Sequence, residues 1–220
     1  MDVKKILAAT DHTLLRPAAT WKEIELLLEE ALEFGCASAC IPPSYVYEAA
    51  SYVRGRLPIC TVVGFPTGYD TTGSKLFETE DALESGADEI DMVINLGWVK
   101  DGLWELVQDE IEQIRDLCED TVLKVIVETC ELTGQEKIHL CRIVTDSGAD
   151  FIKTSTGFGS GGATADDIRL FKAHVGPQVG IKASGGIRTL EDAKILMDLG
   201  ATRLGASSLV KLARQLGDQA

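Results

Sequence analysis

The sequence predicts an α/β fold, a single (β/α)8 barrel of the TIM type that takes up residues 1–220 as one domain. Helical patterns end on a recurring phrase with glycine at its centre, and each phrase leads into a short apolar run. The phrases stand at Gly35, Gly86, Gly148 and Gly200. Glycine just past a helix supplies the left-handed conformation that other residues adopt only at a steric cost. Since no Pro/Ser-rich linker divides the series, the repeated units indicate one domain.

Eight runs have the length and composition of strands. They lie at residues 7–11, 38–41, 59–63, 89–94, 123–128, 151–154, 179–183 and 203–206. Eight helical patterns alternate with them, at residues 21–34, 44–54, 74–85, 102–118, 134–147, 165–174, 189–198 and 207–216. Four of these helices open on capping-box patterns, at Thr20, Thr133, Thr164 and Thr189. Eight alternating units favour a closed barrel over an open doubly wound sheet, which usually carries fewer.

The composition is that of a globular protein with a sizeable core, 45% hydrophobic and 25% charged. A net charge of −14 argues against nucleic acid and anionic membrane surfaces as partners, because both require a basic face. No apolar run reaches membrane-spanning length, and charges stand where a signal peptide needs apolar residues, so we expect a cytoplasmic location. The six cysteines lack zinc or disulfide spacing and are interpreted as reduced thiols.

Charged residues fall on the inner face of several predicted strands. Side chains of a barrel strand alternate between the lumen and the helix layer. With the apolar neighbours assigned to the helix layer, the residues that point inward are Lys124, Lys153, Lys182 and Asp91, with Asp11 near the mouth. Structural ion pairs are the alternative reading of each residue alone. Because barrel active sites lie at the C-terminal ends of the strands, five converging charges favour a catalytic site.

Two neighbouring lysines have a specific chemical use. Each ammonium group disfavours protonation of the other, and desolvation acts in the same direction, so one amine can be neutral near pH 7. A neutral amine forms a Schiff base with a carbonyl, and the iminium accepts the electrons released when an adjacent carbon–carbon bond breaks. A nearby carboxylate can shuttle the protons. Lys153, Lys182 and Asp91 supply this set.

Donors suited to a phosphate group follow the sixth, seventh and eighth predicted strands. The candidate phosphate-binding residues are Thr156, Gly157, Gly185, Gly186, Gly205, Ser207 and Ser208. Paired glycines can expose successive backbone N–H groups, and the serines stand where the last helix begins. Glycine turns and serine caps are common for structural reasons, but loops after strands seven and eight are the recurrent phosphate site of such barrels.

Seven motifs, taken in order, closely resemble those of the deoxyribose-phosphate aldolase family. They are DHTLLRP (11–17), VGFPTG (63–68), EIDMVINLG (89–97), LKVIVETCEL (123–132), DFIKTSTGF (150–158), VGIKASGGIRT (179–189) and GASS (205–208). The combination of IKTSTGF, IKASGG and EIDMV is far more specific than any one piece. The resemblance implies a class I aldolase with no metal or other cofactor, which interconverts 2-deoxy-D-ribose 5-phosphate with D-glyceraldehyde 3-phosphate and acetaldehyde.

The resemblance also implies a role for each lumen residue. Lys153 would form the Schiff base, Lys182 would favour the neutral amine of Lys153 and assist proton transfer, and Asp91 would relay protons through an ordered water. Lys124 and Asp11 would complete the polar network. Some relatives carry a lysine directly after TSTG, where this chain has phenylalanine, so backbone and serine donors are expected to carry more of the phosphate binding.

Three other functions stay open. A different Schiff-base aldolase would use the same lysines on another phosphorylated sugar, and a non-catalytic barrel would bind a phosphorylated metabolite without forming an imine. A metal-dependent aldolase would need ligands, and His12, His139 and His174 lack ligand spacing. The expected partners are a small phosphorylated aldehyde or sugar and further copies of the chain, as a dimer or a tetramer.

Overall fold

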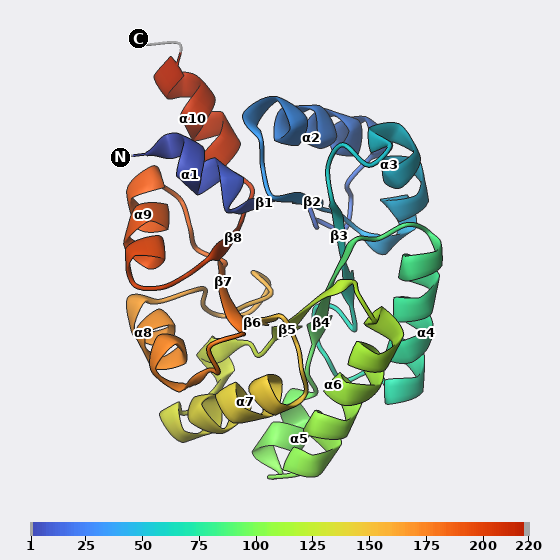
Figure 1. Cartoon of the computed structure of the whole chain (residues 1–220), viewed down its shortest axis with the longest axis vertical. Helices are drawn as coiled ribbons and strands as arrows, with labels where there is room; N and C mark the ends of the chain where they lie inside the picture. The colour runs from blue at the N-terminus through green and yellow to red at the C-terminus, as the bar shows by residue number, and fades with distance from the viewer. Residues whose placement is uncertain (1, 218–220) are drawn as a thin grey trace.

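Eight parallel strands form a closed barrel in the order of the sequence (Figure 1). The computed structural model describes residues 2–217. The strands are β1 (Thr10–Thr13), β2 (Ser38–Cys40), β3 (Ile59–Val63), β4 (Glu89–Val93), β5 (Val122–Ile126), β6 (Phe151–Lys153), β7 (Gly180–Ser184) and β8 (Arg203–Ala206). Because β1 pairs with β2 on one side and with β8 on the other, the sheet closes on itself, and the predicted (β/α)8 architecture is confirmed.

Helices surround this barrel (Figure 1). They are α1 (Val3–Ala8), α2 (Trp21–Phe34), α3 (Val46–Val53), α4 (Thr72–Glu84), α5 (Leu96–Lys100), α6 (Trp104–Cys118), α7 (Gly134–Asp146), α8 (Ala165–His174), α9 (Leu190–Asp198) and α10 (Leu209–Gly217), with 3-10 turns η1 (Pro43–Tyr45) and η2 (Thr129–Glu131). Capping boxes form at Thr20, Thr133 and Thr189 as predicted. These caps fix where three of the helices begin.

The first strand begins later than predicted. Residues 7–11 were expected to form a strand, but Leu7 lies in α1 and β1 starts at Thr10. In the segment VKKILA the two lysines are exposed while Ile6 and Leu7 are buried, which is a helical pattern that the five-residue window at 7–11 cuts off. The short helix packs against α9 and α10 (Figure 1).

Three helix boundaries also differ from the prediction. The helix predicted at 44–54 divides into η1 and α3, since proline favours the first turn of a helix. The helix predicted at 102–118 begins at Trp104, and the short helix α5 precedes it. The last helix begins at Leu209, which leaves the two preceding serines outside it. These changes leave the order of strands and helices around the barrel as predicted.

The strand side chains alternate as predicted between two interiors. Ile90, Met92, Leu123, Ile152 and Ile181 belong to the apolar core that contains the buried faces of the helices. The charged residues between them turn into the lumen, as the period of two requires. Within residues 2–217, no helix is both long enough and apolar enough to cross a membrane.

Candidate active site

The strand register brings the predicted lumen residues together. Asp91 on β4 is the Cα partner of Lys124 on β5, and Lys153 on β6 is the partner of Lys182 on β7. Neighbouring strands lie about 4.8 Å apart, so paired side chains on one face must meet. All four residues are buried, with Lys153 3% exposed and the other three fully inaccessible at 0%.

The Asp91 carboxylate is the centre of this group. Its Oδ2 accepts hydrogen bonds from Lys153 Nζ at 2.7 Å and from Lys182 Nζ at 2.6 Å. Its Oδ1 accepts from Lys124 Nζ at 2.8 Å and from the Cys60 thiol at 3.2 Å. One carboxylate oxygen therefore connects the predicted Schiff-base lysine with its predicted cationic neighbour. That oxygen can take a proton from Lys153 and return it with little movement.

Further ion pairs extend the network toward the N-terminal ends of the strands. Asp11 on β1 contacts Lys182 Nζ and accepts a hydrogen bond from Arg203 Nη1 at 2.6 Å. Glu89 on β4 lies 2.6 Å from Lys124 Nζ, and its carboxylate accepts from Arg203 Nη1 at 3.1 Å. This geometry fits the predicted roles of Asp11 and Lys124 as parts of a polar network. The network supports Asp91 on the side away from the C-terminal ends of the strands.

Glu89 and Arg203 were not predicted as site residues. Each stands at the start of its strand, two residues before a predicted site residue, Asp91 in one case and Gly205 in the other. Residues two apart share a face of a strand, so the same alternation places both side chains in the lumen. The signal was present in the sequence, although strand ends are commonly solvated.

Burial and charge act against each other in this network. Burial raises the pKa of Asp91, but Lys124, Lys153 and Lys182 outweigh that effect and hold the pKa well below its usual value. Burial likewise disfavours the ammonium form of Lys182, and the carboxylates of Asp11 and Asp91 reverse this effect and raise its pKa. The two carboxylates therefore stabilise the charged form of Lys182, which keeps a positive charge beside Lys153.

A cavity of about 340 Å³ opens at the C-terminal ends of β1, β6, β7 and β8. Lys153 lines it, whereas Lys124 and Lys182 do not and are fully buried behind it. A carbonyl compound in this cavity can reach the amine of Lys153 and neither of the other two lumen amines. This difference in access selects Lys153 as the candidate nucleophile.

Six of the seven predicted phosphate-binding residues line the same cavity. They are Thr156, Gly157, Gly185, Gly186, Gly205 and Ser207. Both members of the glycine pair after β7 have φ near 77°, in the left-handed region that favours glycine. Ser208, the seventh, does not line the cavity. Its hydroxyl donates to Ile187 O at 3.3 Å and so ties the loop after β7 to the start of α10.

Thr156 lines the cavity with both of its donors already in use. Its backbone N–H lies 3.3 Å from each carboxylate oxygen of Glu128, and its hydroxyl donates to the same carboxylate. Glu128 is buried and has a left-handed backbone with φ of 54°, which is uncommon outside glycine. Glu128 was not predicted as a site residue, because it stands at the end of a predicted strand. Its left-handed backbone conformation has no signal in the sequence.

Two residues at the cavity bear on how an anion would bind. Arg16, which was not predicted, lines the cavity about half exposed and pairs with Glu23. Phe158 also lines it and packs edge-on against Phe65, with ring centroids 5.4 Å apart. Arg16 after β1 therefore supplies positive charge to the cavity, while Phe158 gives it an aromatic wall.

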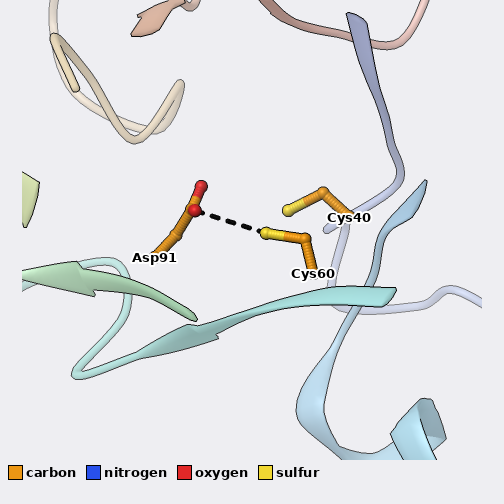
Figure 2. Close-up of side chains that lie close together, drawn as sticks. All are labelled: Cys40, Cys60 and Asp91. Atoms are coloured by element: carbon orange, nitrogen blue, oxygen red, sulfur yellow. Dashed lines mark hydrogen bonds between the residues drawn. The ribbon is translucent and has the colours of Figure 1, made fainter. Parts of the chain in front are cut away.

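Two cysteines face the lumen beside Asp91. Figure 2 shows Cys40 and Cys60 next to that carboxylate, and the three potential ligand atoms lie within 4.8 Å of one another. The donor types suit a soft metal ion. However, the carboxylate already accepts from three ammonium groups, and Lys124 Nζ also lies 3.3 Å from the Cys60 sulfur. A divalent cation here would meet strong repulsion, so the donor set fits an ammonium network better than a metal.

The three histidines lie away from this network. His12 Nε2 is 3.0 Å from a carboxylate oxygen of Glu30 on α2. His139 stacks on Trp104 with ring centroids 4.1 Å apart, and His174 is the last residue of α8. Within residues 2–217, none of the three belongs to a group of side chains close enough to share a metal ion.

Comparisons with known proteins agree with this fold. Residues 5–212 match the DeoC/LacD family of aldolases. The chain is 58% identical over 214 residues to the deoxyribose-phosphate aldolase of Streptococcus pyogenes serotype M2, across 97% of this chain and 96% of that protein. The solved deoxyribose phosphate aldolase of Aeropyrum pernix superposes with a TM-score of 0.91 at 31% identity, across 100% of this chain and 94% of that one. The aldolase QR15 gives a TM-score of 0.92 at 37% identity, across 100% and 97%.

A closed parallel barrel with its cavity at the C-terminal ends of the strands is the architecture of the (β/α)8 barrel enzymes. This chain belongs to the DeoC/LacD family of aldolases. It is therefore a lyase that breaks and forms carbon–carbon bonds. The family resemblance drawn from the seven motifs is confirmed.

Proposed function

We propose that the chain is a class I deoxyribose-phosphate aldolase, which cleaves 2-deoxy-D-ribose 5-phosphate to D-glyceraldehyde 3-phosphate and acetaldehyde. The observation that carries the proposal is the position of Lys153. It is the lumen lysine that reaches the cavity, and it shares Asp91 Oδ2 with Lys182. A relative that is 58% identical over 97% of the chain is named deoxyribose-phosphate aldolase.

The reaction begins at the Lys153 amine. Its neutral form attacks C1 of the open-chain sugar, and loss of water from the carbinolamine gives an iminium. Breaking of the C2–C3 bond sends the bonding electrons into the iminium and leaves an enamine on Lys153, while the C3 hydroxyl loses its proton and glyceraldehyde 3-phosphate departs. Protonation of the enamine at C2 and hydrolysis then release acetaldehyde and restore the amine.

Asp91 and Lys182 handle the protons. The Oδ2 of Asp91 touches both lysine amines, so it can take a proton from Lys153 and pass it on, directly or through an ordered water. Lys182 stays charged between Asp11 and Asp91 and keeps a cation beside the reacting amine. Lys124 fixes the other oxygen of Asp91 and prevents the carboxylate from turning away.

The substrate phosphate binds at the loops after β7 and β8. Gly185 and Gly186 offer backbone N–H groups, and Ser207 precedes α10, whose N-terminus favours an anion. Gly157 forms the facing wall with Thr156, which Glu128 holds in place. Ser208 acts as a support for the loops. Deoxyribose without its phosphate loses these contacts and binds more weakly.

The proposed chemistry uses no metal and no other cofactor. The iminium is the electron sink, and both oxygens of the Asp91 carboxylate are engaged by ammonium groups. Activity should therefore withstand EDTA.

We also propose that residues 1–220 form a single domain, which assembles as a homo-oligomer in the cytoplasm. Pairing of β1 with β8 joins the two ends of the chain in one sheet, and residues 218–220 lie outside the described part. The relative from Aeropyrum pernix is a tetramer. All six cysteines are free thiols, which suits a reducing compartment. Light scattering of the purified protein distinguishes a dimer from a tetramer and from a monomer.

Reductive trapping tests the function. The protein is incubated with 2-deoxyribose 5-phosphate, reduced with borohydride and mapped by mass spectrometry, and we expect a stable adduct on Lys153. Lys153→Ala should give no adduct and no turnover. Lys182→Leu should react slowly, with its pH optimum moved upward, because the neighbouring cation is lost. Unchanged activity in either variant would contradict the assignment.

Other outcomes of the same experiment would support one of the alternative functions. An adduct on Lys124 or Lys182 keeps the enzyme class and reverses the roles of the lysines. An adduct formed only with other phosphorylated sugars indicates a different Schiff-base aldolase. Tight phosphate binding with neither adduct nor turnover indicates a barrel that binds a phosphorylated metabolite.

A further inference from the structure

The lumen contains one more cationic group than carboxylates. Its charged side chains are Asp11 (β1), Glu89 and Asp91 (β4), Lys124 (β5), Lys153 (β6), Lys182 (β7) and Arg203 (β8). The thiols of β2 and β3, Cys40 and Cys60, complete the ionisable groups that the eight strands turn inward. In the cavity above, Arg16 lines the same space as the reacting lysine and pairs with a glutamate. Four positive groups thus share three negative ones.

The carboxylates hold these four cations unequally. Lys124 contacts three carboxylates, and Lys182 and Arg203 contact two each. Lys153 contacts Asp91 alone, and that carboxylate is shared with two other lysines. When one proton leaves the group, its loss from Lys153 breaks the fewest favourable charge contacts. The surplus positive charge is therefore released at the amine that faces the cavity.

Glu89 and Arg203 occupy the end of the lumen away from the cavity. Neither lines the cavity, and neither contacts Lys153. Arg203 Nη1 lies 2.6 Å from Asp11 and 3.1 Å from Glu89, and its guanidinium carbon is 5.3 Å from the centre of the Phe151 ring. The pair is thus connected to the reacting amine only through other charged side chains. Because the intervening space is protein, salt screens these charges far less than it screens surface charges.

We propose that Glu89 and Arg203 are positioning residues that set the charge of the lumen and, through it, the pH at which Lys153 becomes a nucleophile. The inference rests on the proposed Schiff-base function and deepens it. Arg203 supplies the surplus positive charge, and Glu89 limits that surplus. Loss of the Glu89 charge makes the lumen more positive and favours release of the proton. Loss of the Arg203 charge makes the lumen less positive and favours its retention.

The test compares the pH profile of kcat/KM for the wild type, Glu89→Gln and Arg203→Met. This quantity reports ionisations of the free enzyme. We expect the acidic limb to move to lower pH in Glu89→Gln and to higher pH in Arg203→Met. Each shift should be on the order of one pH unit, the effect of a unit charge about 10 Å away at an effective permittivity of about 20. Arg203→Lys keeps the charge and should keep the limb near its wild-type position.

A merely structural role predicts something different. A structural role would lower the rate or the stability of both variants. The acidic limb of the pH profile would then stay in place, or would move in the same direction in both variants. Either result would overturn the proposal. If Arg203→Met does not fold, Glu89→Gln decides alone, because it keeps the shape of the side chain and removes only its charge. Borohydride trapping of the wild type distinguishes a failure of this proposal from a failure of the proposed function. An adduct on Lys153, together with variants whose pH profiles are not shifted, would contradict this inference alone. No adduct at any pH would contradict the proposed function itself.

Discussion

Lysine side chains replace the branched apolar residues that usually fill the inside of such a barrel. Their alkyl stems pack while their amines pair with carboxylates, so one residue type supplies both volume and charge. Glycines leave room for the stems. A Cβ at Gly205 would lie 3.3 Å from Lys182 Cε and 2.9 Å from Ser184 Cβ. Outside the lumen, a Cβ at Gly64 would lie 2.7 Å from Cε of Lys75, a buried lysine on α4. Glycine at these two positions therefore makes room for buried lysine stems.

Gly162, in the loop between β6 and α8, gives a prediction about phosphate binding. A Cβ there would lie 2.3 Å from Gly185 O and 2.9 Å from Gly186 N, so Gly162→Ala must displace the loop after β7. We expect KM for 2-deoxyribose 5-phosphate to rise about 10- to 100-fold, as loss of hydrogen bonds to a charged group implies. The rise should be much smaller for unphosphorylated deoxyribose.

A matched glycine substitution controls for the change in backbone freedom. A Cβ at Gly73 on α4 meets nothing within 4 Å, so Gly73→Ala should leave the kinetics with both substrates unchanged. It should also raise the stability by up to about 1 kcal/mol, the usual gain of alanine over glycine in a helix. An equal loss with both substrates in Gly162→Ala would mean that the loop does not bind the phosphate.

At the scale of elements, a buried ion pair joins two of the outer helices. Lys75 on α4 lies 2.8 Å from Glu110 on α6 and donates at 2.8 Å to Val93 O at the end of β4. Burial lowers the pKa of Lys75 and raises that of Glu110, although each charge favours the other. Desolvation therefore outweighs the attraction between the two groups, and the pair adds little net stability while its rupture remains costly.

Lys75→Met should consequently destabilise the protein by about 3–5 kcal/mol, because it leaves the Glu110 carboxylate buried and unpaired. The double variant Lys75→Met/Glu110→Leu should recover most of that loss, since it removes both charges and keeps the volume. Urea unfolding of the two variants and the wild type measures the difference. A double variant as unstable as the single one would show that the ion pair itself holds α4 to α6.

The strands and loops also show which features of the site could be predicted from the sequence. Alternation along a strand is local, so it was enough to place Lys153, Lys182 and Asp91 in one lumen before any tertiary contact was known. The left-handed backbone of Glu128 was not predictable, because it depends on the loop that Thr156 anchors. The predicted start of the first strand was wrong for a different reason, since the helical pattern of α1 lies mostly before the predicted run at 7–11 and is visible only over the longer segment VKKILA.

At the scale of the whole molecule, the charges separate by location. The chain carries a net charge of −14, yet its lumen holds a surplus of positive groups. Closure of the barrel is what creates that region. The hydrogen bond between Asp11 and Arg203 joins residues 192 positions apart, and it forms only when β1 meets β8. The acidic composition and the anionic substrate are thus compatible because folding keeps most acidic residues outside the lumen.

Closure also couples the stability of the fold to pH through Asp11. Burial raises the pKa of Asp11, and Lys182, Lys124 and Arg203 together lower it below its ordinary value of 3.8. A carboxyl group with a lowered folded pKa stabilises the fold above its unfolded pKa and loses that contribution as pH falls through the folded one. Asp11→Asn should therefore cost about 2–4 kcal/mol at pH 7, and the difference from the wild type should shrink below pH about 4.

Urea unfolding at pH 7, 5 and 3.5 measures this convergence. Asp166→Asn is the matched control, because that aspartate pairs with Arg169 on the surface with 93% of its side chain exposed, and its loss should change the stability by less than about 0.5 kcal/mol at each pH. A deficit in Asp11→Asn that stays constant down to pH 3.5 would mean that the residue stabilises the barrel through shape and hydrogen bonding. A shrinking deficit would mean that the charge of Asp11 holds the first and last strands together, so that acid would loosen the barrel at the seam where it closes.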